Sequence, residues 1–491
     1  MPADSPDHGG CRMKISRREA MTGLAALGLC GGPAFGQGTA LRPGSAEDLI
    51  AAAQLGGEVS YVVVDARSGL VLEQRGADRG MPPASTAKTI TSLYALETLG
   101  PDYRFRTRLI ATGPIAGGKI QGDLVLAGGG DPTLETDALA EMAARLAAAG
   151  VRGVTGRFLV WGGAIPSAEQ IADDQPVQVG YNPGISGLIL NYNRVYFEWK
   201  RAAGGYALTM DARGARNVPR VYSADVGLSS RAAPLFTYAR QGGKEHWTVA
   251  TGSLGKAGSR WLPVRDPVAY AGDVFQTLAR AQGVPLPAPK PVAMLPGGTV
   301  LVEQASAPLP VILRAMMKHS TNVTAEAVGM TTSVARGAPA GRGASGAAMS
   351  EWLHARLGGG RARFVDHSGL GADTRISAME MVRAVTLLGP KAGLRGLMKP
   401  FALRDAGGKV QQGQALRVDA KTGTLNFVST LTGYMTAPDG TELAFAIFTG
   451  DVARRARAGA SEQPQGGRAW ISRSKVLQSA LLERWGALYG S

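Results

Sequence analysis

The chain has 491 residues, which is too long for one ordinary domain and predicts about two to four. Hydrophobic residues make up 45% and charged residues 19%, a balance typical of globular proteins with a sizeable core. The net charge is +15, and 40 of the 53 basic residues are Arg while 13 are Lys. No dense basic run occurs, so nucleic acid is not a predicted partner. The excess of positive charge can indicate an anionic partner such as acidic lipid or cell-wall polymer. It can equally reflect a general drift of the composition toward arginine.

The N-terminus has the features of an export signal. Arg17 and Arg18 precede an apolar stretch from Ala20 to Phe35, which is too short to span a bilayer. The arginine pair resembles a twin-arginine signal, and the general secretory route also fits. We expect residues 1–36 to be a leader and signal peptide cleaved before Gln37, and the mature protein to be periplasmic.

Both cysteines, Cys11 and Cys30, lie in this segment, so the mature chain would contain none. This excludes thiolate catalysis, disulfides and cysteine metal sites. The five histidines form no H-E-x-x-H motif, and Gly128–Gly130 is not followed by the Gly-Lys-Ser/Thr of a phosphate-binding loop. No later apolar run approaches the ~18 residues of a membrane span. We therefore expect no metal, no cofactor and no stable membrane span.

Hydrophobic periodicity and turn residues predict the secondary structure in chain order. The first elements are strands at Glu58–Val64 and Leu70–Gln74 and a helix at Ala84–Leu99. The middle predicts a helix at Asp137–Ala149, short strands between about 190 and 265, and a boundary near Val284–Pro296. The last elements are a helix at Leu309–Ser333, strands at Leu416–Lys421, Asn426–Met435 and Leu443–Phe448, and a helix at Gly467–Leu488.

Three short motifs occur along these elements: Ser85-Thr86-Ala87-Lys88 at a helix start, Ser320-Thr321-Asn322, and Lys421-Thr422-Gly423 at a strand end. Residues three apart share one face of a helix, so Lys88 can lie beside the Ser85 hydroxyl. A buried lysine loses its proton more readily and can then act as the base for a serine. Together the motifs match the S-x-x-K, S-x-N and K-T-G elements of penicillin-binding proteins and serine β-lactamases.

Each motif alone is short enough to arise by chance, and a single lysine is most often a solvated surface charge. The combination favours catalysis, because lysine is scarce and two of the 13 fall in these positions. A rival serine triad lacks support, since the chain contains no G-x-S-x-G elbow. His319 and His367 lie beside motifs, but a structural or surface role is the simpler interpretation.

Longer stretches make the resemblance specific. The run Pro83–Lys88, followed by Gly100–Phe105, resembles the class C low-molecular-mass penicillin-binding proteins, which are D-alanyl-D-alanine carboxypeptidases and endopeptidases. Further matching segments are Gly122–Leu124, Gly128–Pro132, Asn191–Asn193, His319–Asn322, Asp366–Leu370 and Ala420–Thr424. The resemblance covers nearly all of the mature chain. Thr321 departs from it, because Asp often occupies this position, but the chemistry does not use that side chain.

The resemblance implies a role for each matching residue. Ser85 would attack the carbonyl between two D-alanines and form an acyl-enzyme, with Lys88 as its general base. Ser320 would relay a proton toward the leaving amine, and Asn322 would hold the peptide group of the substrate. Lys421 would place positive charge near the substrate carboxylate and support the proton relay.

The implied substrate-binding set also includes Thr422, Gly423 and Thr424. The two threonine hydroxyls would hydrogen-bond the substrate carboxylate, and the backbone N–H groups of Ser85 and Thr424 would form the oxyanion hole. The implied ligands are peptidoglycan stem peptides and crosslinks, with β-lactam antibiotics as inhibitors.

The implied fold is α+β, with a five-stranded antiparallel sheet flanked by helices. Ser85 and Ser320 are 235 positions apart, too far for one sheet connection, and the resemblance fills this stretch with two accessory domains. The expected bounds are 39–105 and 293–491 for the catalytic domain, 106–130 and 191–292 for the first insert, and 131–190 for the second.

Three functions are compatible with these residues. The first is a periplasmic D-Ala-D-Ala carboxypeptidase or endopeptidase, with the balance between the two activities left open. The second is a β-lactamase or esterase of the same superfamily, which the long insert disfavours. The third is a non-catalytic wall-binding protein, which the intact Ser85, Lys88 and Lys421 disfavour.

Overall fold

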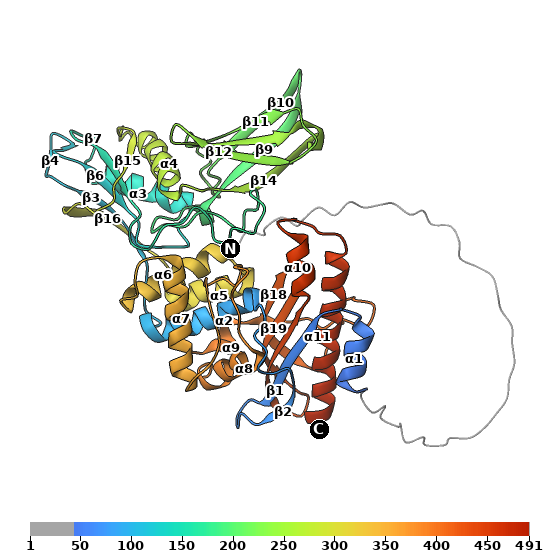
Figure 1. Cartoon of the computed structure of the whole chain (residues 1–491). Helices are drawn as coiled ribbons and strands as arrows, with labels where there is room; N and C mark the ends of the chain where they lie inside the picture. Colours follow the sequence, from blue (N-terminus) through green and yellow to red (C-terminus); the bar gives the residue numbers. More distant parts are fainter. Residues whose placement is uncertain (1–43, 491) are drawn as a thin grey trace, which may run out of the picture. The chain divides into compact units, whose positions relative to one another are not determined.

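The structure is a computed structural model, and it describes residues 44–490 (Figure 1). The expected signal peptide, its cleavage point and both cysteines lie outside the described residues. Within them, the two ends of the chain build a sheet covered by helices, which we call the catalytic region. The middle of the chain, from β3 (Arg106–Ala111) to β16 (Thr299–Ala305), builds a set of smaller sheets, which we call the accessory region.

A six-stranded antiparallel sheet lies at the centre of the catalytic region, in the order β17-β18-β19-β20-β1-β2. Its strands are β1 (Glu58–Asp65), β2 (Val71–Arg75), β17 (Lys399–Pro400), β18 (Arg417–Leu425), β19 (Val428–Thr436) and β20 (Glu442–Gly450). The five expected strands are present, and the two-residue β17 adds a sixth at the edge. Since β1 pairs with β20, the N-terminal and C-terminal parts of the chain close one sheet.

Strand β1 shows why helices cover both faces of this sheet. Successive side chains of a strand point to opposite faces, and here both sets are buried and apolar. Tyr61 and Val63 pack with α11, while Val62 and Val64 pack with α2 and α8. The helices on the first face are α1 (Ala46–Ala53) and α11 (Gly467–Tyr489). The second face carries α2 (Ala87–Leu99), α5 (Leu309–His319), α6 (Asn322–Ala335), α7 (Arg342–Leu357), α8 (Ala378–Leu387) and α9 (Leu394–Leu397).

The single helix expected at 309–333 is two helices, α5 and α6. Ser320 ends α5 with a left-handed backbone conformation (φ 59°, ψ 35°), and its N–H donates to the carbonyl of Met316. Apolar residues continue at helical spacing on both sides of the break, so the periodicity gave no sign of it. The break matters because Ser320 continues neither helix and its hydroxyl instead meets Lys421 of β18.

The accessory region contains a five-stranded sheet in the order β15-β8-β6-β3-β16. Its strands are β3 (Arg106–Ala111), β6 (Leu124–Ala127), β8 (Phe158–Trp161), β15 (Pro289–Pro291) and β16 (Thr299–Ala305). Helices α3 (Thr136–Ala148) and α4 (Pro267–Ala281) pack with it in one apolar core. Three small sheets complete the region. The first consists of β4 (Ile115–Ala116), β5 (Lys119–Ile120) and β7 (Gly153–Val154), and the second of β9 (Arg194–Ala202), β10 (Gly205–Asp211) and β14 (Ala257–Pro263). The third consists of β11 (Ala224–Ser229), β12 (Phe236–Gln241) and β13 (Lys244–Ala250).

The strand pairing does not follow the expected domain bounds. Strand β8, from the expected second insert, pairs in parallel with β6 of the first. Strand β16, from the expected catalytic domain, pairs with β3 of the accessory region. Bounds at 130 and 292 therefore cut through one sheet. Glycine and proline runs mark loops, but the pairing of strands far apart in the sequence leaves no local signal.

Candidate active site

The candidate nucleophile, Ser85, lies in a short 3-10 turn, Ala84–Thr86, that leads into α2. The carbonyl of Pro83 accepts hydrogen bonds from the hydroxyls of Thr86 and Thr430, both at 2.6 Å. Because Thr430 belongs to β19, these bonds tie the turn to the central sheet. Ala84 has a φ of 47°, a region that residues with a Cβ seldom adopt, so surrounding contacts hold the turn in place.

Two glycines let other segments approach this turn closely. A Cβ on Gly423 would lie 2.8 Å from the Pro83 carbonyl oxygen and 2.9 Å from the Ser85 nitrogen, and it would also overlap the Thr430 hydroxyl. A Cβ on Gly369 would overlap the Ala84 carbonyl oxygen. The glycine of the K-T-G motif is therefore required because β18 passes directly against the backbone of Ser85.

Lys88 is completely buried beside Ser85. Its Nζ donates to Ser85 Oγ at 2.9 Å, to Asn322 Oδ1 at 2.8 Å and to the Ser368 carbonyl at 2.8 Å. Burial lowers the pKa of Lys88 to about 7, although the carboxylates of Asp366 and Glu326 oppose this change. A lysine with this pKa is partly neutral near pH 7, which is the state that accepts a proton from a serine.

Lys421 approaches the same site from β18. Its Nζ donates to Ser320 Oγ at 3.0 Å and to the Thr422 carbonyl at 2.7 Å. Burial holds the pKa of Lys421 well below its ordinary value, and the positive charges of Lys88 and Lys399 lower it further. The left-handed backbone conformation of Ser320 accompanies its hydrogen bond with Lys421, so the break between α5 and α6 is part of the site.

A pocket of about 290 Å³ opens onto these groups. Its lining consists of Ser85, Gln175, Tyr181, Ser320, Asn322, Gly369, Leu370, Thr424, Leu425, Asn426 and Arg455. Four of the predicted residues thus reach the pocket: Ser85, Ser320, Asn322 and Thr424. Lys88, Lys421 and Gly423 are buried behind its wall, and Thr422 is partly buried beside them.

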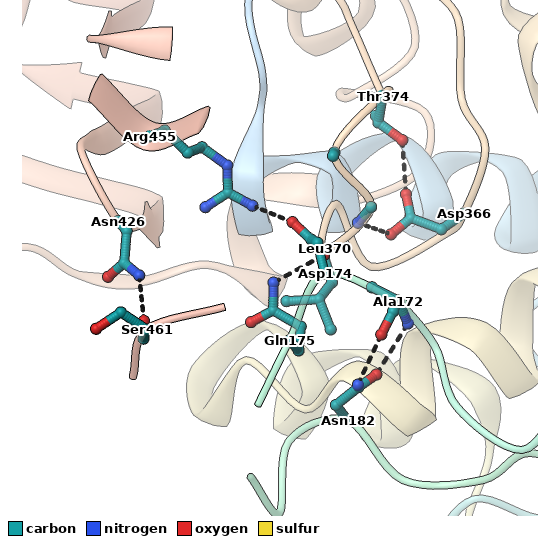
Figure 2. Close-up of polar contacts among 12 residues, drawn as sticks. Ala172, Asp174, Gln175, Asn182, Asp366, Leu370, Thr374, Asn426, Arg455 and Ser461 are labelled. Atoms are coloured by element: carbon teal, nitrogen blue, oxygen red, sulfur yellow. Dashed lines mark hydrogen bonds and ion pairs between the residues drawn. The ribbon is translucent and has the colours of Figure 1, made fainter. Parts of the chain in front are cut away.

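The accessory region also contributes to the pocket, through the segment 165–190. The carbonyl of Tyr181 accepts a hydrogen bond from Asn322 Nδ2 at 2.9 Å. Asn322 is therefore held at both ends, because its Oδ1 already accepts from Lys88, and one N–H of its amide remains for a ligand. On the other side of the pocket, Arg455 of α10 (Val452–Ala458) forms an ion pair with Asp174 at 2.9 Å (Figure 2).

Buried side chains fix the path of this segment. The Arg265 guanidinium donates to the carbonyls of Glu169, Val177 and Asn182 at 3.2, 2.8 and 2.6 Å. The Asn182 side chain in turn forms two hydrogen bonds with the backbone of Ala172, as Figure 2 shows. The sequence interpretation missed Tyr181 because a backbone carbonyl has no side-chain signature. It missed Arg455 because that residue lies in an arginine-rich stretch that reads as a solvated helix.

His367 is fully buried next to the site, and burial lowers the pKa of its imidazole to about 4. Its Nε2 is 2.7 Å from Ser345 Oγ and does not reach the pocket lining. Across residues 44–490, no group of three His, Cys, Asp or Glu side chains is arranged to hold a metal ion. In the same range, no helix has both the length and the apolar character needed to cross a bilayer.

Comparison with known proteins identifies the family. Residues 44–466 match the D-Ala-D-Ala carboxypeptidase 3 (S13) family. The chain belongs to this family. It is 32% identical over 427 residues to a D-alanyl-D-alanine carboxypeptidase of Actinomadura sp., with 80% of this chain and 78% of that protein covered. It is 28% identical over 417 residues to carboxypeptidase DacB of Mycolicibacterium smegmatis, with 80% and 76% covered.

The fold agrees with this assignment. The structure is similar to the crystal structure of penicillin-binding protein 4 from Haemophilus influenzae, with a TM-score of 0.72, 21% identity, and 89% of this chain and 99% of that one covered. A second structure of the Haemophilus protein, with a TM-score of 0.70, is a complex with a β-lactam. The resemblance inferred from the motifs is confirmed, and so is the α+β penicillin-binding-protein fold. This S13 protein is a serine-type D-Ala-D-Ala carboxypeptidase.

Proposed function

We propose that this carboxypeptidase is periplasmic, exported by a twin-arginine-like or general secretory signal, and removes D-alanine from peptidoglycan stem peptides through an acyl-enzyme on Ser85. The observation that supports the assignment is the 2.9 Å contact between Lys88 Nζ and Ser85 Oγ, in which the lysine is fully buried and the serine lines the pocket. A neutral amine at this distance can take the hydroxyl proton directly.

The proposed reaction has two halves. Ser85 Oγ bonds to the carbonyl carbon of the penultimate D-alanine while its proton passes to Lys88, and the backbone N–H groups of Ser85 and Thr424 stabilise the oxyanion. The C–N bond then breaks, and the proton that Lys88 took from Ser85 passes through the Ser320 hydroxyl to the leaving amine, while Lys421 supports the relay through its hydrogen bond to Ser320 and keeps its own proton. Water next adds to the acyl-enzyme, which releases the shortened peptide as a carboxylic acid and restores the Ser85 hydroxyl.

Substrate recognition would use the remaining predicted residues. Asn322 retains one free amide N–H for the peptide carbonyl of the substrate, and the hydroxyls of Thr422 and Thr424 would hydrogen-bond its terminal carboxylate. The low pKa of Lys421 does not prevent it from supplying positive charge there. An arriving carboxylate raises the pKa of a neighbouring ammonium, so the substrate itself would hold the proton on Lys421.

Cleavage of crosslinks is a second candidate activity. A further cavity of about 290 Å³ adjoins the pocket and shares Gln175, Asn426 and Arg455 with it. Together the two cavities give room for a longer or branched peptide than a single stem. This favours an endopeptidase activity beside the carboxypeptidase activity.

Labelling with a fluorescent penicillin tests the nucleophile, because the β-lactam ring mimics the D-Ala-D-Ala bond. We expect one adduct on the peptide that contains Ser85 and none in Ser85→Ala. Labelling that persists in Ser85→Ala would disprove the assignment. Mass spectrometry of a pentapeptide and a crosslinked muropeptide after incubation would then compare the two activities.

A further inference from the structure

Glu326 is a fully buried carboxylate for which the proposed reaction has no use. It lies on α6, four residues after Asn322, and therefore on the same face of that helix, directed at the site. An ionised carboxylate is costly to remove from water unless its environment compensates. It lies close enough to the candidate base, Lys88, for their charges to interact.

Its hydrogen-bond partners are backbone groups of the loop that faces Lys88. Glu326 Oε1 accepts from the Ser368 N–H at 2.9 Å and from the His367 N–H at 3.1 Å. The carbonyl of Ser368 accepts from Lys88 Nζ at 2.8 Å. Thus Glu326 holds the N–H of Ser368 and Lys88 holds its carbonyl, so a single residue joins the two buried ionisable groups.

We infer that Glu326 is a positioning residue for Lys88. By binding the loop, Glu326 holds the Ser368 carbonyl against the Lys88 ammonium, and the negative charge of Glu326 favours the protonated form of that amine. This inference rests on the proposed role of Lys88 as the base. It adds a residue whose charge sets the pH at which that base becomes active.

The charges around the two groups are few. Asp366 and Glu326 face Lys88, and the ammonium of Lys421 lies near it on β18. Glu326 is in turn faced by Asp366 and Lys88. Burial, with the charge of Asp366, raises the pKa of Glu326 to about 7, while burial lowers the pKa of Lys88 to about 7. The two groups therefore titrate in the same range, and their titrations are coupled because the charged form of each stabilises the charged form of the other.

Asp366 is less suited to this role because its oxygens have other partners. They accept from the Thr374 hydroxyl at 2.7 Å (Figure 2), from the Gly371 N–H at 2.8 Å and from the Ser368 hydroxyl at 3.1 Å. These bonds shape the loop 366–374 itself. Glu326 reaches the loop from another helix, so it fixes the loop relative to Asn322 and Lys88.

The test is the pH dependence of acylation by a fluorescent penicillin, measured with the full protein carrying Glu326→Gln. An amide oxygen still accepts from the Ser368 N–H, but the negative charge is gone. Without that charge Lys88 loses its proton more easily. Wild-type Glu326 is ionised mainly at and above pH 7, so the midpoint of the rate profile should move down by about half a pH unit. At the wild-type midpoint the rate relative to the plateau should rise about 1.5-fold.

A matched control is available in Glu380→Gln. Glu380 is also buried and accepts from three backbone N–H groups, those of Arg361, Ala362 and Ser377, at 2.6, 2.7 and 2.9 Å. It has no contact with the loop that faces Lys88. We expect this variant to keep the wild-type midpoint, whatever its effect on the melting temperature.

An unchanged midpoint in Glu326→Gln would overturn the inference, because a merely structural acceptor leaves the titration of Lys88 where it was. If that variant does not fold, Glu326→Asp provides the same test. Its carboxylate is withdrawn by one methylene, so a smaller downward shift is expected, and no shift contradicts the inference. Failure of the proposed function is distinguishable, since acylation would then persist in Ser85→Ala or in Lys88→Arg.

Discussion

The surroundings of Lys88 and of Lys421 differ although both lysines are buried at one pocket. Lys88 has three oxygen acceptors and two carboxylates nearby, and these carboxylates oppose the effect of burial on its pKa. Lys421 has a hydroxyl and a carbonyl as acceptors, and its nearest charges, those of Lys88 and Lys399, are positive. One lysine is thus poised between its two protonation states, whereas the other, in the proposed function, gains its charge when an anionic ligand binds.

The surroundings of each lysine thus suit it to a different one of the two roles that we propose. Lys88 is enclosed by segments far apart in the sequence, α2, α6 and the loop at Ser368. Lys421 is enclosed mainly by its own strand and by the break between α5 and α6. If the two environments are as distinct as the geometry indicates, the two lysines should respond differently to substitution and to pH.

The largest effect is expected at Lys88. Lys88→Ala should slow acylation by about 10³-fold for every substrate, because within residues 44–490 Lys88 is the basic side chain hydrogen-bonded to Ser85 Oγ. Lys88→Arg should not restore activity, since a guanidinium keeps its proton near neutral pH. Acylation rates with penicillin and with an uncharged thioester provide the measurement. Substantial activity in Lys88→Arg would remove the lysine-base mechanism and, with it, the contrast between the two lysines.

Lys421→Ala should have the next largest effect, about 10²-fold on substrates that carry a carboxylate. The loss should be smaller on an uncharged thioester, which has no carboxylate to bind. Lys421→Arg should retain part of the activity because it preserves the positive charge. The same two substrates report the difference, and equal losses on both in Lys421→Ala would contradict the carboxylate role.

The pH dependence of the wild-type enzyme separates the lysines without mutation. Acylation needs neutral Lys88, and its pKa is lowered to about 7, so the neutral fraction rises as the pH increases through 7. Below this midpoint the acylation rate should fall about tenfold per pH unit. Stopped-flow labelling between pH 5 and 9 would measure the profile. A rate that keeps rising toward pH 10 would indicate a lysine with an ordinary pKa.

The smallest effect is expected where the accessory segment meets the pocket. Arg455→Ala removes the ion pair with Asp174, so the segment that carries Tyr181 loses one of its anchors and the peptide KM should rise about threefold. Arg457→Ala on the same helix is a suitable control because that side chain is exposed and far less constrained. If both variants have the same KM, the ion pair does not position the pocket wall.

Much of the site was predictable because its chemistry depends on short local patterns. Ser85 and Lys88 are three apart at a helix start, and Lys421 ends a stretch with strand character, so residue type and spacing together indicated the reaction class. The main strands and helices of the catalytic region followed from periodicity, since each buries one regular apolar face. The same patterns supported the family assignment that comparison with known proteins confirmed.

Tertiary structure alone decided how those motifs meet and what surrounds them. The left-handed turn at Ser320, the Tyr181 carbonyl on Asn322 and the pairing of β8 with β6 depend on contacts between segments distant in the sequence, and no local pattern encodes them. The lowered pKa of Lys88 belongs to the same class. The sequence determined that a lysine stands beside the serine, but only folding removed that lysine from water and placed Glu326 and Asp366 near it, because burial and buried charges are properties of the packed chain.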